Sequence, residues 1–187
     1  MFIQTEVTPN PAVIKFLPGQ SVLEKGTAEF KAVEEAVKAP LATRLFSLQG
    51  VEAVFLAADF ISVTKADDTD WSMLKPMVLG ALMEHFSTGQ PIVSADFYED
   101  GSGGEAEDDD EISAQIRELI DTRVRPMVAM DGGDIEFERF DDGIVHLRMR
   151  GACAGCPSST MTLKSGIENM LKHFVPEVIE VRQVADF

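Results

Sequence analysis

An acidic, glycine-rich run at residues 96–110, DFYEDGSGGEAEDDD, limits what this 187-residue chain can fold into. It holds eight acidic residues, three glycines and no basic residue. Such a segment cannot bury enough apolar surface to offset the entropy that is lost when it orders. It is typical of a flexible tether that repels itself. We therefore expect two small α+β domains, 1–93 and 111–187, joined by a flexible acidic linker at 94–110.

The charge of the chain bears on its partners. The formal net charge is −16, and the composition is otherwise ordinary for a globular protein, with 45% hydrophobic and 26% charged residues. A chain this acidic repels phosphate backbones and anionic lipid, so we expect neither nucleic-acid nor membrane partners. The sequence has no apolar run of about 18 residues that would span a bilayer. The stretch MFIQTEVTPNP resembles neither a secretory signal nor a transit peptide, which predicts a cytosolic protein.

Hydrophobic periodicity predicts a complete α+β fold in the first domain. The expected elements are strands at 1–7, 12–17 and 26–30, a helix at 39–49, two strands within 51–65, and a helix from Asp70 to about Ser87. Asp70 is the expected N-cap of the last helix. We expect His85 on the surface of that helix. Trp71 and most methionines are expected in the core.

The second domain is predicted to follow the order α-β-β-α-β. The expected elements are a helix over 112–128 interrupted at Pro126, a turn at 130–134 (MDGGD), strands at 135–140 and 144–149, a helix between Pro157 and Pro176, and a strand at 178–184. Asp131 and Asp134 are interpreted as turn and capping residues. The last helix should bury its apolar face, which comprises Leu163, Ile167, Met170, Leu171 and Phe174.

The only two cysteines of the chain, Cys153 and Cys156, lie in a loop between the second predicted strand and the last helix of this domain. The loop, residues 150–161, reads RGACAGCPSSTM. Two cysteines are too few for a disulfide scaffold, and an intracellular C-x-x-C pair more often serves metal or redox chemistry. The spacing alone fits half of a metal or cluster site, a thiol–disulfide couple, or an incidental pair.

Neighbouring residues favour an iron–sulfur site. The following helix N-terminus favours thiolate, and Arg148 and Arg150 add positive potential if they point toward the loop. The small residues of the loop let backbone amides approach bound sulfur closely. Such a cluster usually needs four thiolates, and this chain supplies two. Two chains could share one cluster about a twofold axis, or the other ligands are external. A site at an interface is labile, which suits a carrier.

Two alternatives use the same loop. A thiol–disulfide oxidoreductase also places its cysteines between a strand and a helix, but no aromatic residue precedes Cys153 and the proline follows the pair. A zinc site would need His146 or His173. His146 falls on the strand face opposite Val145, and His173 lies too far along its helix. The oxidoreductase is retained as the alternative function.

Several stretches resemble the Nfu family, whose C-terminal module is the NifU C-terminal-like domain. In the second domain they are RPMVAMDGGDIEF (125–137) and MRGACAGCPSSTMTLKSGIENML (149–171). In the first domain they are MFIQTEVTPNPAVIKFLPG (1–19), PLATRLFSLQGVEAVF (40–55) and DFISVTK (59–65). Ala12 and Val13 stand where the family commonly has Asn and Ala.

The resemblance implies an iron–sulfur cluster scaffold or carrier rather than an enzyme. It implies that Cys153 and Cys156 of two chains hold one transferable [4Fe–4S] cluster, so that the protein is a cluster-bridged homodimer. It further implies an upstream cluster donor and apo iron–sulfur proteins as clients. By family similarity and by its lack of cysteine, the first domain is assigned to partner recognition. The resemblance favours the bacterial cytoplasm, with a mature mitochondrial matrix form as the second location.

Overall fold

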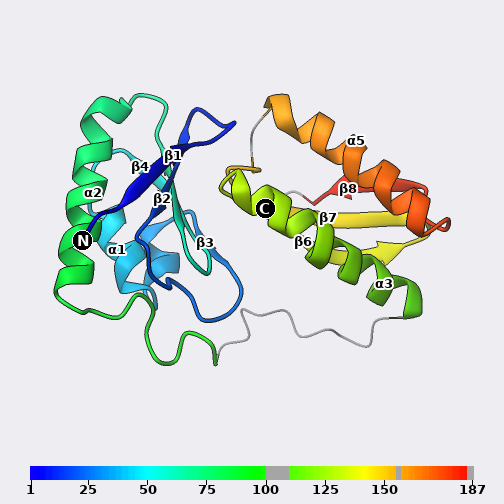
Figure 1. Ribbon diagram of the computed structural model, residues 1–187, viewed down its shortest axis with the longest axis horizontal. Helices are drawn as coiled ribbons and strands as arrows, with labels where there is room; N and C mark the ends of the chain where they lie inside the picture. The colour runs from blue at the N-terminus through cyan, green and yellow to red at the C-terminus, as the bar shows by residue number, and fades with distance from the viewer. Residues whose placement is uncertain (100–109, 155–156, 185–187) are drawn as a thin grey trace. The chain divides into compact units, whose positions relative to one another are not determined.

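The structure is a computed structural model that describes residues 1–99, 110–154 and 157–184, without the side chains of 157–160. The chain forms two compact units, Met1–Glu105 and Ala106–Phe187 (Figure 1). Each unit combines a β-sheet with helices, which confirms the α+β class. The predicted flexible linker falls mainly on residues 100–109, which lie outside the described residues.

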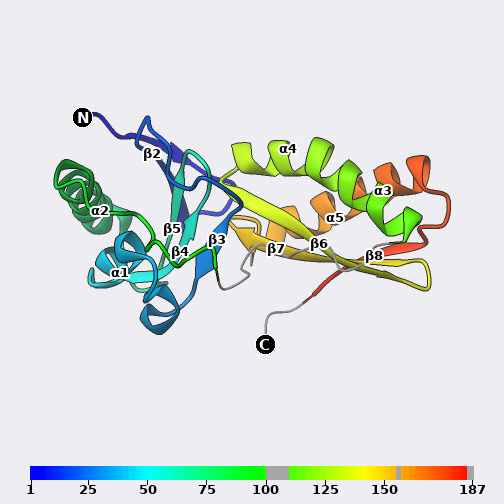
Figure 2. The same cartoon turned by 90° about the horizontal axis from the view of Figure 1, so that it is seen from below.

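The N-terminal unit is built on a five-stranded antiparallel sheet in the order β1-β2-β5-β4-β3. Its strands are β1 (Gln4–Val7), β2 (Val13–Leu17), β3 (Ala28–Phe30), β4 (Val51–Leu56) and β5 (Ile61–Lys65). The helices are the 3-10 turn η1 (Val33–Ala36), α1 (Pro40–Phe46) and α2 (Trp71–Ser87). α1 and α2 pack beside each other on the sheet (Figure 2). Every predicted element of this unit is present, with ends shifted by a few residues.

Helix α2 starts where the sequence predicts, because Oδ1 of Asp70 accepts a hydrogen bond from the backbone N–H of Ser72 at 2.8 Å.

The predicted surface position of His85 is wrong. Its side chain is fully buried, and Nε2 lies 3.1 Å from the carbonyl oxygen of Pro91. That carbonyl can only accept, so Nε2 carries the proton. Burial lowers the pKa of His85 below its ordinary value, which keeps the imidazole neutral.

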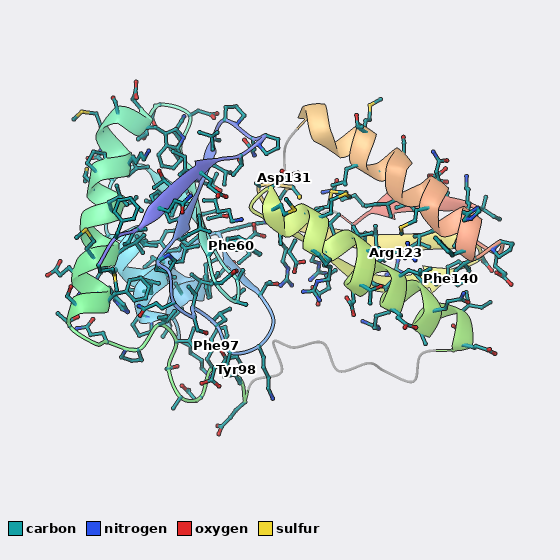
Figure 3. All side chains as sticks on the ribbon, viewed as in Figure 1. Phe60, Phe97, Tyr98, Arg123, Asp131 and Phe140 are labelled. Carbon is teal, nitrogen blue, oxygen red and sulfur yellow. The ribbon has the colours of Figure 1, made fainter. Side chains whose placement is uncertain are left out.

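The N-terminal unit extends past residue 93, which corrects the predicted start of the linker. Phe97 is 9% exposed and packs against Phe30, with 6.5 Å between the ring centroids. The neighbouring Tyr98 accepts a hydrogen bond from the backbone N–H of Glu24 through its hydroxyl oxygen. Figure 3 shows the two aromatic side chains next to each other at the edge of this unit. The acidic residues around Phe97 and Tyr98 predict a linker, although this aromatic pair belongs to the folded N-terminal unit.

The C-terminal unit has the predicted order α-β-β-α-β. It comprises α3 (Glu111–Leu119), the π-helical turn η2 (Ile120–Val124), α4 (Arg125–Met130), β6 (Gly133–Asp141), β7 (Ile144–Gly151), α5 (Pro157–Phe174) and β8 (Glu180–Gln183). The sheet order is β6-β7-β8, with an antiparallel β6–β7 hairpin and parallel β7–β8 pairing. The helices cover one face of this sheet (Figure 2). Residues of β7 accordingly alternate between buried and half-buried.

The interruption predicted at Pro126 is a widened helical turn. The π-helical turn η2 ends at Val124, and Pro126 is in the first turn of α4. Proline has no N–H to donate, so the normal helical bonding pattern fails one turn before it.

The predicted burial of Phe174 is wrong, because its ring is 40% exposed and stacks beneath the Arg123 guanidinium at 4.8 Å.

Candidate functional site

The cysteine loop runs from the end of β7 to the start of α5. Gly151 has a positive φ of 62°, a conformation that favours glycine and turns the chain out of the strand. The backbone N–H of Ala154 then donates to the carbonyl oxygen of Gly151 at 3.1 Å, which closes a turn around Cys153. Cys156 lies outside the described residues. Of the two predicted ligands, the structure therefore places Cys153.

Cys153 is buried. It is 7% exposed and belongs to the apolar core cluster of the C-terminal unit. The small neighbours allow this burial, because Ala152, itself 4% exposed, lets the loop fold back onto the sheet. The thiol is held against protein atoms and away from bulk water.

A glycine pair braces the loop from the opposite strand. The backbone N–H of Ala152 donates to the carbonyl oxygen of Gly132 at 3.2 Å. Gly133 is paired with Gly151 across the β6–β7 hairpin. A Cβ on Gly133 would overlap Sγ of Cys153 and would lie only 2.9 Å from the backbone nitrogen of Cys153. The backbone of β6 thus forms the wall against which the thiol rests, and only glycine leaves room for it.

Sequence reasoning did not find this role of Gly133. The motif MDGGD predicts a sharp turn, and Gly132 does adopt the positive φ, 80°, that such a turn requires. The second glycine has no positive φ and no turn function. A glycine that the turn does not need is a signal of close approach by another group. The identity of that group follows only from the hairpin register.

Beside the glycine pair, Asp134 forms a buried ion pair with Arg125 of α4. The Arg125 guanidinium donates from Nε to Oδ1 at 2.9 Å and from its terminal nitrogen Nη2 to Oδ2 at 2.8 Å. Asp134 is 4% exposed. Its hydrogen bonds raise the pKa of Arg125 above the ordinary value. The predicted turn role of Asp134 omits this partner, which fixes α4 to the start of β6 next to the loop.

The two arginines expected to add positive potential to the loop are paired with acids. Arg148 lies 3.3 Å from a carboxylate oxygen of Glu138, and Arg150 lies 2.9 Å from a carboxylate oxygen of Glu136. Both glutamates belong to β6, so these pairs cross the hairpin. Each arginine is therefore balanced by a glutamate, and the expected excess of positive charge from Arg148 and Arg150 is absent from these pairs.

Among the residues that the structure describes, the histidines do not form a metal site with Cys153. Within the described ranges, no three His, Cys, Asp or Glu side chains converge on a common point. His173 is exposed near the end of α5, next to the ring of Phe174, and His146 is half-buried on β7. Cys153 thus receives no further protein ligand from the described part of its own chain.

Comparison with known families decides what the loop belongs to. The family model "Scaffold protein Nfu/NifU N terminal" matches residues 3–89, and the model "NifU-like domain" matches residues 116–182, which include the cysteine loop. The chain belongs to the Nfu/NifU family. Membership is shared by both units, since each is matched by its own family model.

Relatives align with the chain over its whole length. The human protein "NFU1 iron-sulfur cluster scaffold homolog, mitochondrial" is 49% identical, and the alignment covers 100% of this chain and 73% of that protein. "NifU-like protein 4, mitochondrial" from Arabidopsis thaliana is 51% identical, with coverage of 100% and 67%. Relatives of the Nfu/NifU family thus share both units of this chain in one polypeptide.

Solved structures also resemble this Nfu/NifU chain in part. The NMR structure of a NifU-like protein from Saccharomyces cerevisiae is 24% identical, covers 51% of this chain and 86% of its own, and has a TM-score of 0.46. In the described part of the chain, no helix is both long and apolar enough to cross a bilayer.

Proposed function

We propose that this member of the Nfu/NifU family binds a labile [4Fe–4S] cluster between two copies of the chain and transfers it to apo-proteins. The cluster is cargo, held through Cys153 and Cys156 of each copy. The observation that carries the proposal is the braced position of Cys153 in a chain that has only two cysteines. The named relatives, which include an iron–sulfur cluster scaffold homolog, support the same role.

The ligand count explains why two copies are needed. A cluster of this type usually takes four thiolates, and one chain supplies two. The described residues provide no further converging ligands around Cys153. A twofold arrangement repeats the same loop and completes the set with the fewest distinct contacts. Separation of the copies then removes half of the ligands, which gives a direct route to release.

The two units would divide the work. The N-terminal unit holds no cysteine, so it offers no thiolate for a cluster. We assign it to recognition of the cluster donor or of client proteins. The acidic composition of residues 100–109 suits a tether that lets the cysteine unit reach a client bound elsewhere. The proposed location is the bacterial cytoplasm or the mitochondrial matrix, and the two relatives quoted above are named as mitochondrial.

Anaerobic reconstitution with iron and sulfide tests this function. We expect a brown protein with about four iron atoms and four acid-labile sulfides per dimer, and dimerisation that follows cluster content. Cys153→Ala and Cys156→Ala should each abolish cluster binding. Alanine keeps the buried position of Cys153 apolar, so unchanged thermal unfolding of this variant serves as the folding control. A protein that stays colourless and monomeric after reconstitution would refute the proposal.

The same protein separates the alternative function. A thiol–disulfide oxidoreductase would reduce insulin disulfides as a monomer and would show a defined reduction potential. Such an activity needs an attacking thiolate that reaches the disulfide of its substrate. Disulfide reduction by metal-free monomer at a substantial rate, without cluster binding, would favour the oxidoreductase.

A further inference from the structure

The surface around the cysteine loop carries exposed methionines. Met127 and Met130 on α4 are 52% and 75% exposed, and Met161 on α5 is 78% exposed. We call these three residues the methionine collar. α4 leads into Gly132, whose carbonyl oxygen accepts a hydrogen bond from Ala152 of the loop, and α5 begins directly after Cys156. Figure 1 shows that α4 ends and α5 begins at the same end of the C-terminal unit.

The collar is also nearly free of charge. Residues 126–133 contain one charged residue, Asp131, and residues 161–167 contain one, Lys164. By contrast, residues 111–125 of the same helical segment contain six charged residues. The solvent-facing side of this segment therefore changes from charged to apolar as it approaches the loop. Figure 3 shows Asp131 at this end of α4.

From these observations we propose that the methionine collar is the surface on which a second copy of the chain docks when the cluster is shared. The inference rests on the proposed function, because the cysteine site needs the loop of a partner copy. It adds which residues make the contact. Methionine suits such a surface because its flexible, polarisable side chain adapts to another apolar surface and separates from it again.

Charge and position together identify the occupant. Each copy has a formal charge of −16, so two copies repel each other as whole molecules. A contact surface of low charge lessens this repulsion, and the collar is such a surface beside the loop that two copies would share. A twofold contact also matches each collar with an identical one, so apolar surface meets apolar surface without a separate complementary patch.

Glutamate substitution in the collar tests the inference. Met130→Glu places a new carboxylate in the contact from each copy, and Met161→Glu does the same from the other helix. Both positions are strongly exposed, so folding should be unaffected. The matched control is Met73→Glu on α2, where the methionine is 70% exposed in the N-terminal unit and the net charge changes equally.

The measurement is anaerobic sedimentation velocity of reconstituted protein over a concentration series, with iron content determined in the same samples. We expect the dimer dissociation constant to rise about tenfold or more for Met130→Glu and Met161→Glu, because like charges that face each other are strongly unfavourable. Met73→Glu should match the wild type. Added salt should restore part of the loss.

The outcomes separate this inference from the function beneath it. If the wild type binds no cluster or stays monomeric, the proposed function itself fails. If the wild type loads and dimerises but the collar variants dimerise as the control does, the collar is not the contact. Normal dimers with slowed cluster transfer to an apo-acceptor would assign the collar to a client and overturn the inference. An equal loss in Met73→Glu would also overturn it.

Discussion

Replacement of Gly133 by alanine probes the wall behind the cysteine. The added Cβ would lie 2.9 Å from the backbone nitrogen of Cys153 and 3.0 Å from the carbonyl oxygen of Arg150, and it would overlap Sγ of Cys153. Two of these three neighbours are backbone atoms, which cannot rotate away as a flexible side chain would. The loop must shift as a whole. We therefore expect Gly133→Ala to lower both the stability of the C-terminal unit and its cluster loading.

The size of the effect follows from two opposing contributions. Overpacking at a close contact costs about 1–3 kcal/mol. Replacing glycine by alanine restricts the unfolded chain and recovers about 0.4–1 kcal/mol. The net loss is about 1–2 kcal/mol, which for a unit of this size lowers the unfolding midpoint by roughly 5–10 °C. The matched control is Gly166→Ala in α5, where a Cβ meets nothing within 4 Å and alanine favours the helix.

Thermal unfolding followed by two signals measures the effect. The only tryptophan, Trp71, lies in the N-terminal unit, so its fluorescence reports that unit and should not change. Far-UV circular dichroism reports both units and should show an earlier transition in Gly133→Ala. Gly166→Ala should be slightly more stable than the wild type. If Gly133→Ala unfolds with the wild type and loads a full complement of iron, the braced geometry of Cys153 is refuted.

Three further predictions address the rest of the structure. Arg125→Met removes the ion pair of the buried Asp134 carboxylate with Arg125 and should cost about 2–3 kcal/mol, somewhat below the value for fully buried pairs because Arg125 is partly exposed. Circular dichroism measures this loss, and Arg125→Lys should lose less. Burial lowers the pKa of His85 below 6.5, so the unfolded chain binds a proton at this histidine more readily than the folded chain does. The N-terminal unit should therefore lose stability as the pH falls below 6.5, which Trp71 fluorescence measures. His85→Gln should make the stability of this unit depend less on pH in that acidic range. Phe97→Ala should destabilise the same unit by about 2 kcal/mol if residue 97 belongs to its core, whereas unchanged unfolding would return that residue to the linker.

Periodicity and capping chemistry were sufficient to predict the elements of this fold. The Asp70 cap, the interruption before Pro126 and the β6–β7 hairpin all depend on local sequence, and each lies where it was predicted. The errors concern contacts between a helix or strand and the residues outside it. His85 is buried because a carbonyl six residues later folds back onto it. Phe97 joins the core through a ring on β3, which no local pattern around the acidic run reveals.

The candidate site was predicted in chemistry but not in geometry. The C-x-x-C motif identifies Cys153 as a ligand candidate, yet its burial depends on Gly133, which lies on another strand. Arg148 and Arg150 were expected near the thiols, but the strand register pairs them with glutamates. Most methionines were expected in the core, and many are exposed. The hydrophobicity of methionine alone does not show whether its side chain lies in the core or on the surface.

The exposed sulfur atoms of the collar have a consequence for oxidative damage. Met130 and Met161 are 75% and 78% exposed, whereas Cys153 is 7% exposed. An oxidant in solution therefore meets the thioethers before it meets this thiol. Conversion to the sulfoxide makes these side chains polar, and methionine sulfoxide reductases can reverse it. If the collar is the contact between copies that we propose, mild oxidation would thus weaken this contact first and leave Cys153 intact.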